Sequence, residues 1–204
     1  MDYEKLAPKE VVNKTIDALK ERGIRAEFVN NGEEALGRLK DLIPDGAEIM
    51  TGSSTTLDQI GFVDLLKSKN HPWENLKDAI VAEKDPAKQA KLRKQSVTAD
   101  YFLGSVHAIT QSGEIITASA SGSQLPSYAF ASDNVIWVAS TNKIVPTFED
   151  GMKRIREYVY PLEDKRMKSL GFPGSFISKL LIIEREMMPN RKLTLILVNE
   201  KLGF

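Results

Sequence analysis

Residues 47–62 read AEIMTGSSTTLDQIGF, the pattern of a buried strand that leads through a polar loop into a helix. Ala47–Met50 is a short apolar run of the kind that forms a strand inside a sheet. After the loop, Leu57, Ile60 and Leu65 recur at the spacing of one helix face. The stretch therefore predicts one strand–loop–helix unit of an α/β fold.

The loop inside this stretch is rich in hydroxyl groups, since five of the six residues 51–56 are Ser or Thr and the sixth is Gly52. The free N–H groups and the dipole at a helix N-terminus favour negative charge, and hydroxyls add uncharged donors. We therefore predict a phosphate or carboxylate site formed by Thr51, Gly52, Ser53, Ser54 and Thr55. The plainer alternative is a helix capped by Ser54 or Thr55, which needs one hydroxyl rather than five. The loop lacks the Gly-Lys-Ser/Thr ending of a Walker A loop, so a nucleoside triphosphatase is not expected.

Length and composition limit the class of protein. The chain has 204 residues, 42% of them hydrophobic, which is enough for one buried core, so residues 1–204 are expected to form a single domain. Lys+Arg and Asp+Glu both number 28, and this balance argues against a nucleic-acid partner. With no cysteine and two histidines, neither a metal site nor an iron–sulfur cluster is expected, and no cofactor is predicted. The acidic N-terminus and the lack of an apolar run of about 18 residues indicate a cytoplasmic protein without a membrane span.

The remaining pattern predicts a mainly parallel sheet covered by helices. Helices at 8–22 and 32–43 flank a strand at 25–29, and this alternation is typical of a parallel sheet. Residues 69–97 are polar and are expected to form a helical excursion from the sheet. The strands predicted beyond it are Val106–Thr110 paired with Glu114–Thr117 in a hairpin, Val135–Ala139, Lys179–Arg185 and Lys192–Val198. The last two are expected to form a C-terminal antiparallel hairpin.

Two further segments follow predicted strands and are candidates for the same site. Ser121, Gly122, Ser123 and Gln124 precede a short helix, and Asn142 and Lys143 follow the VIWVA strand. Because the carboxyl ends of parallel strands meet at one edge of a sheet, we expect these segments to share a pocket with the 51–56 loop. The alternatives are that residues 121–124 form only a capped turn and that Lys143 is simply solvated.

Asp100 and His107 are the candidate acid/base residues. In the alternative interpretation Asp100 braces a loop and the His107 side chain only packs in its strand. These two residues do not make up a complete set of catalytic groups. The sequence therefore does not predict a reaction, and it leaves open whether the protein is an enzyme.

Several motifs resemble those of the LUD domain family, the DUF162-type proteins named for lactate utilisation. They are TGSSTTLDQIGF, ADYFLGSVHAIT, GSQLPSYAF, VIWVASTNKIV, RIREYVYPLED and LVNEKLGF, in the order and spacing of the family. The string GSQLP is typical of one subgroup. Many stand-alone members carry a cysteine cluster before the final strands, and this chain has none, so redox chemistry of its own is not expected.

The resemblance implies the fold shared by ribose-5-phosphate isomerase, glucosamine-6-phosphate deaminase and the CoA transferases, which is a Rossmann-like three-layer α/β sandwich. It implies a protein that binds a small anionic metabolite, either an organic acid, a sugar phosphate or an acyl-CoA, in organic-acid or lactate utilisation. The alternative is a non-catalytic accessory or scaffold subunit of an organic-acid oxidation system. The polar excursion and the apolar closing residues Leu202 and Phe204 also lead us to expect a homodimer.

Overall fold

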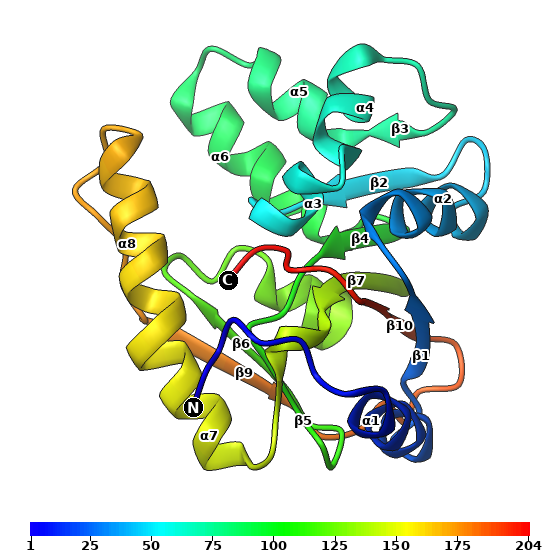
Figure 1. Cartoon of the computed structure of the whole chain (residues 1–204). Coiled ribbons are helices and arrows are strands. Elements are labelled where there is room, and N and C mark those ends of the chain that lie inside the picture. The colour runs from blue at the N-terminus through cyan, green and yellow to red at the C-terminus, as the bar shows by residue number, and fades with distance from the viewer.

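The computed structural model describes all 204 residues and is built around a six-stranded sheet (Figure 1). The strands run in the order β1-β10-β7-β4-β2-β3, and every neighbouring pair is parallel. Their bounds are β1 Arg25–Val29, β2 Glu48–Thr51, β3 Glu74–Asn75, β4 Tyr101–Gly104, β7 Asn134–Ser140 and β10 Lys192–Val198. The central strands β7 and β10 read NVIWVAS and KLTLILV, which suits strands buried on both faces. The predicted α/β architecture with a mainly parallel sheet is confirmed.

One face of this sheet is covered by α2 (Gly32–Leu42), α3 (Thr55–Gln59) and α4 (Phe62–Ser68). Their apolar side chains, such as Leu39 and Phe62, form one buried cluster with the side chains of β7 and β10 that point to this face. Apolar residues at helical spacing on α2 to α4 therefore meet alternate residues of the central strands.

The opposite face packs against α1 (Lys9–Glu21), the π-helical turn η2 (Ser127–Ala131) and a second sheet. This second sheet has the strand order β8-β5-β6-β9, with β5 Ala108–Thr110, β6 Ile115–Ser119, β8 Ile144–Val145 and β9 Lys179–Ile183. β5 and β6 pair antiparallel, so the predicted hairpin between them is confirmed. The far side of the second sheet is covered by one helical segment made of α7 (Phe148–Arg154), the π-helical turn η4 (Ile155–Val159) and α8 (Tyr160–Ser169) (Figure 1).

The predicted C-terminal hairpin of residues 179–198 is wrong, because its two strands lie in different sheets. β9 pairs antiparallel with β6, whereas β10 lies between β1 and β7. β9 leaves Leu180 and Ile182 exposed, as befits an edge strand packed on one face, but β10 is buried along nearly its whole length. Burial of both faces of β10 in the parallel sheet therefore outweighs the turn signal between the strands.

The polar excursion is helical, as predicted: it forms two helices and also supplies the short edge strand β3. The helices are α5 (Leu76–Ala82) and α6 (Pro86–Gln95), followed by the 3₁₀ turn η1 (Ser96–Thr98). Asn75 and Asp85 accept backbone N–H groups and act as their N-caps. No helix of the chain has both the length and the apolar sequence needed to cross a bilayer.

The closing residues fold back onto the protein itself. Leu202 is buried in the cluster beneath α2 to α4, and Phe204 is half-buried beside the cavity described below. These two side chains therefore do not offer the free apolar surface that led to the expectation of a homodimer, and the oligomeric state stays a prediction.

Candidate functional site

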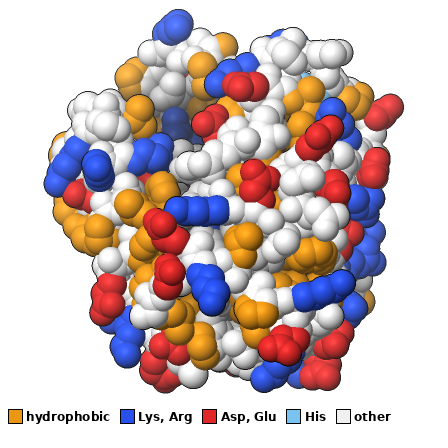
Figure 2. Space-filling model, in the orientation of Figure 1, with side chains coloured by type: hydrophobic (Ala, Val, Ile, Leu, Met, Phe, Trp, Pro, Cys, Tyr) orange, Lys and Arg blue, Asp and Glu red, His pale blue; other side chains and the backbone are white.

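The carboxyl ends of β2, β4 and β7 open into a cavity of about 580 Å³. The parallel sheet forms one side, and the other sides come from α5, α6, β6, α8 and residues 203–204. Figure 2 shows a hollow in this face of the molecule with a basic side chain inside it. The carboxyl edge of the strands is where open α/β sheets commonly bind their ligands, and the volume is typical of a small-molecule site.

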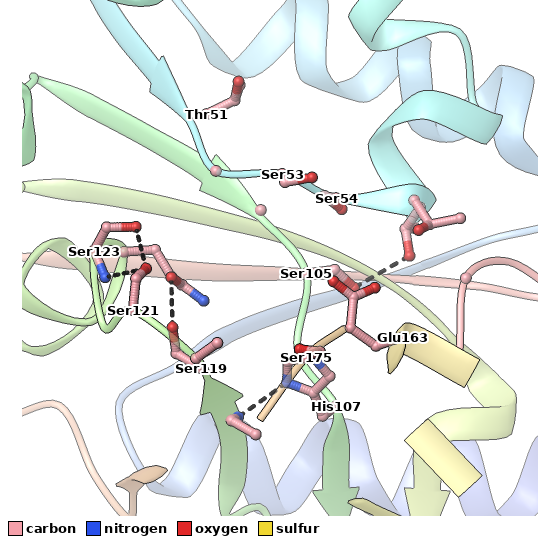
Figure 3. Close-up of a pocket in the computed structure, with 18 of the residues that line it drawn as sticks. Thr51, Ser53, Ser54, Ser105, His107, Ser119, Ser121, Ser123, Glu163 and Ser175 are labelled. Atoms are coloured by element: carbon pink, nitrogen blue, oxygen red, sulfur yellow. Dashed lines mark hydrogen bonds between the residues drawn. The ribbon is translucent and has the colours of Figure 1, made fainter. Parts of the chain in front are cut away.

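The 51–56 loop lines this cavity between β2 and α3 (Figure 3). Ser54 is the N-cap of α3, since its Oγ accepts the N–H of Leu57 at 3.3 Å. The Ser53 and Thr55 hydroxyls have no hydrogen-bond partner within the protein. Because α3 spans only five residues, its dipole adds little to anion attraction. The capping interpretation is therefore right for Ser54, and a role in ligand binding remains a prediction for the other hydroxyls.

Lys143 lies on the cavity wall at the end of the 3₁₀ turn η3 (Thr141–Lys143) that follows β7, with only 2% of its surface exposed. Its Nζ donates to Ser105 Oγ at 3.0 Å and to Thr56 Oγ1 at 3.3 Å, and no carboxylate lies within ion-pair distance. Burial, with a smaller contribution from Arg154, lowers the pKa of Lys143 well below its usual value. Gly203 covers the same Nζ with a positive φ, and a side chain there would collide with Thr56. Lys143 is therefore buried among hydroxyls rather than solvated.

Arg154 is a second buried basic residue near this site. Its Nη1 donates to the main-chain carbonyl of His107 at 2.5 Å, and its Cζ lies 5.2 Å from the Tyr158 ring centroid and 5.9 Å from that of Tyr3. Burial lowers the pKa of Arg154 to about 10, so the guanidinium remains charged at neutral pH. The ring faces stabilise that charge, but no carboxylate neutralises it. Lys143 and Arg154 thus form a buried basic region without an internal counter-charge.

His107 lines the cavity with its ring orientation fixed. Its Nδ1 accepts the N–H of Ala118 at 3.0 Å, so the neutral ring carries its proton on Nε2 (Figure 3). Burial first, then the charges of Lys143 and Arg154, lowers the pKa of His107 to about 3. At neutral pH His107 is therefore a neutral hydrogen-bond donor, which does not suit the predicted acid/base role.

Comparison with known proteins places this architecture in a family. The family model described as LUD domain matches residues 12–198. The chain belongs to the LUD domain family. Among solved structures it is similar to a DUF162 family protein from Deinococcus radiodurans, with a TM-score of 0.57 and 13% sequence identity over 95% of this chain and 99% of that one. At this identity the likeness is one of fold alone. The search of curated proteins gave no match.

In this LUD domain the second polar loop lies directly beside the first on the cavity wall. A Cβ placed on Gly52 would lie 3.8 Å from the Cβ of Gln124. Ser119 Oγ donates to Gln124 Oε1 at 3.0 Å, which braces the loop from within (Figure 3). Among the residues 121–124, those that line the cavity are Ser121, Ser123 and Gln124, whereas Gly122 does not and turns the chain at a φ of 82°. The loop is therefore both a braced turn and part of the cavity wall.

Two other predicted site residues, Asp100 and Asn142, also lie outside the cavity lining. Asp100 is exposed just before β4, where its carboxylate accepts the N–H of Glu48 at 3.3 Å. Because the strands are parallel, the start of β4 lies at the edge opposite to the cavity, so the prediction of Asp100 as the base is wrong and its bracing role is right. Asn142 is buried next to Lys143, and its side-chain amide has no hydrogen-bond partner.

The sequence analysis missed Ser105 and the charged residues that the surrounding helices supply. Ser105 directly follows β4, so the strand-end rule that selected Lys143 would also have found it. Glu163 and Arg166 of α8 form an ion pair with two bonds at 2.7 and 2.8 Å, and Glu163 is the sole acidic residue of the lining. The remaining basic residues of the lining are Lys77 on α5 and Arg93 on α6. No local pattern marks these helical residues, because the packing of distant helices brings them to the cavity.

Ser54→Ala should lower the free energy of unfolding of the ligand-free protein by about 1 kcal/mol, because it removes the N-cap of α3. Urea unfolding measures the change. Ser53→Ala is the matched control, since this neighbouring hydroxyl has no partner, and it should change stability by less than about 0.5 kcal/mol. Equal losses in the two variants would contradict the capping role.

Proposed function

We propose that this LUD domain protein binds a small anionic metabolite in the cavity, either an organic acid, a sugar phosphate or an acyl-CoA. The observation that carries the proposal is Lys143, a buried lysine on the cavity wall whose Nζ contacts two hydroxyls and no carboxylate. Burying a basic group without a partner is unfavourable, and proteins normally pair such groups. A bound anion would supply the missing counter-charge.

The electrostatics of the whole cavity support the same ligand class. Lys77 also faces the cavity, and burial, with a smaller effect of Arg93, lowers the pKa of Lys77. Neither Lys77 nor Arg93 has a carboxylate partner, whereas the Arg166 and Glu163 charges cancel. Three uncompensated bases thus face one space, since Lys143 is the third. Such a convergence favours negative charge and attracts it from solution.

The shape of the cavity suggests a ligand with an apolar part as well as an anionic group. Its volume of about 580 Å³ exceeds what a single carboxylate or phosphate fills. The hydroxyl loops and Lys143 lie beside the strand ends, while Leu170, Phe172 and Phe176 line the cavity from the segment after α8 and remain exposed. An organic acid with a carbon chain, or an acyl-CoA, uses both kinds of surface.

The name of the family, lactate utilisation, agrees with an organic acid as the ligand. The second candidate function is an accessory subunit of an organic-acid oxidation system. One observation favours it, because exposed aromatic side chains such as Phe172 and Phe176 gather beside the cavity and would suit contact with a partner protein. The two functions differ in whether small anions should stabilise the isolated protein.

Anions of the correct class should raise the thermal unfolding midpoint of the isolated protein. A ligand present at 100 times its dissociation constant stabilises the folded state by about 2.7 kcal/mol, which corresponds to roughly 5–10 °C for a chain of this size. Thermal unfolding with inorganic phosphate, lactate, ribose 5-phosphate and acetyl-CoA measures the effect. Ribose and unacylated pantetheine, which lack the anionic groups, are the matched controls and should have no effect.

Stabilisation by the neutral controls to the same extent would contradict anion recognition. If none of these anions, nor a wider panel of organic acids, raises the midpoint, the binding proposal fails and the accessory role is favoured.

A further inference from the structure

We propose that Lys143 is a nucleophile that forms a reversible imine with a carbonyl carbon of the bound anion. This inference rests on the proposed function and narrows its ligand class to oxo acids and to sugar phosphates in their keto or aldehyde form. It assigns Lys143 a covalent role instead of a purely electrostatic one.

The position of Nζ is suited to attack. Ser105 Oγ and Thr56 Oγ1 accept hydrogen bonds from Nζ at 3.0 and 3.3 Å, on the cavity wall. A neutral amine has two N–H donors and one lone pair, so these two acceptors use both N–H groups and leave the lone pair free. Thr56 Oγ1 also donates to Ser105 Oγ at 3.3 Å, which fixes the pair of hydroxyls relative to each other.

The surroundings favour the neutral form of the amine. No carboxylate lies within ion-pair distance of Nζ, and Arg154 places a positive charge nearby. Burial and this neighbouring cation both lower the pKa of Lys143. Desolvation beside another cation is a known way in which proteins activate a lysine for imine formation.

The proposed step balances without an oxidant or a reductant. The Nζ lone pair attacks the carbonyl carbon, the C–N bond forms, and the carbonyl π electrons move to the oxygen. That oxygen takes a proton from nitrogen, passed through the hydroxyl of Ser105 or Thr56, to give a carbinolamine. Loss of the hydroxyl with the remaining N–H proton releases one water and leaves the C=N bond. His107 can donate its Nε2 proton to a ligand oxygen in the cavity, but it is too weak a base to compete for the amine proton.

Lys77 provides an internal comparison. It is also a lysine of the cavity lining, with Nζ 3.4 Å from Thr51 Oγ1 and 3.5 Å from the Gly52 carbonyl oxygen. Its side chain is only partly buried, whereas Lys143 is fully buried. If every lysine of the cavity were equally reactive, both residues would be labelled. The proposed imine predicts labelling of Lys143.

Trapping by reduction tests the proposal on the intact wild-type chain. The protein is incubated at neutral pH with pyruvate, 4-methyl-2-oxopentanoate or dihydroxyacetone phosphate, and sodium cyanoborohydride is added. The matched ligands without a carbonyl group are lactate, 2-hydroxy-4-methylpentanoate and glycerol 3-phosphate. Reduction of the imine gives a stable secondary amine whose mass exceeds that of the protein by one ligand less one oxygen atom. Peptide mapping then locates the adduct.

We expect at least one carbonyl ligand to label Lys143 about tenfold or more above Lys77 and above the exposed Lys14, because of the three only Lys143 is fully buried with its Nζ held by two hydroxyls on the cavity wall. The hydroxy ligands should give no adduct, and Lys143→Met should lose the adduct. If that variant does not fold, the peptide map of the wild type still decides.

Labelling of Lys77 in preference to Lys143 would overturn the proposal. So would the absence of any adduct when the oxo and hydroxy acids raise the unfolding midpoint equally, and in that case the proposed anion-binding function would stand. If no ligand labels the protein and no anion stabilises it, both proposals fail together.

Discussion

Lys143→Met should weaken the binding of a non-carbonyl anion about 10- to 150-fold, the loss expected for one hydrogen bond to a charged group. Methionine has nearly the same length and no charge, so it removes the basic group without opening a large cavity. The hydroxyls that Lys143 leaves behind are not orphaned, because Thr56 Oγ1 donates to Ser105 Oγ at 3.3 Å. The cost should therefore fall on binding and not on the fold.

The same substitution should raise the free energy of unfolding at neutral pH. In the unfolded chain Lys143 regains its ordinary pKa of 10.5, whereas burial lowers the pKa in the folded protein. Between these two pKa values the unfolded state binds more protons, so stability rises with pH up to about 10.5 and is lowest below the folded pKa. Methionine removes this penalty, and the rise of stability between neutral and alkaline pH should become smaller in the variant.

Urea unfolding at several pH values, with titration calorimetry for the anion that stabilises the protein best, measures both effects. Anion binding should tighten as pH falls in the wild type, because a bound anion raises the Lys143 pKa and so takes up a proton. Lys14→Met, at an exposed position on α1, is the control and should change neither quantity. Unchanged affinity in Lys143→Met, with a normal fold, would contradict the assignment of Lys143 to the ligand.

The parts of the fold that could be predicted from the sequence depend on local patterns. The apolar runs of β2 and β7 and the helical spacing in α1 and α2 each reflect burial on one element, so they mark a parallel sheet and its covering helices. Local patterns do not show which strand pairs with which. β9 and β10 are neighbours in sequence, yet each finds a larger buried area in a separate sheet.

The residues of the site also fall into two groups, those that a local sequence pattern marks and those that only tertiary packing brings to the cavity. The 51–55 loop and Lys143 could be found because each lies at or within three residues of the carboxyl end of a parallel strand, and the topology then brings these strand ends together. Asp100 was misplaced because it stands at the start of its strand, and the starts of parallel strands lie at the edge opposite to their carboxyl ends. Lys77, Arg93 and the residues of α8 reach the cavity only through tertiary packing.

His107 gives the protein its largest expected sensitivity to acid. In the unfolded chain its pKa is near 6.5, and in the folded protein burial lowers the pKa to about 3. Between these values the unfolded state binds one more proton, so folding stability should fall by about 1.4 kcal/mol for each pH unit as the pH drops from 6.5 toward 3. Protonation would also break the bond that Nδ1 accepts from the Ala118 N–H.

His107→Asn should remove this loss, because the Asn side-chain oxygen can accept the Ala118 N–H in place of Nδ1 and does not titrate. Urea unfolding of wild type and variant from pH 7 to pH 3 gives the difference, in which the carboxylates common to both proteins cancel. His71→Asn is the matched control, since His71 Nδ1 also accepts a main-chain N–H, that of Trp73 at 3.3 Å. A slope that stays as steep in His107→Asn as in the wild type would show that His107 is not held neutral in the cavity wall, and its role as a fixed Nε2–H donor to the ligand would then have to be abandoned.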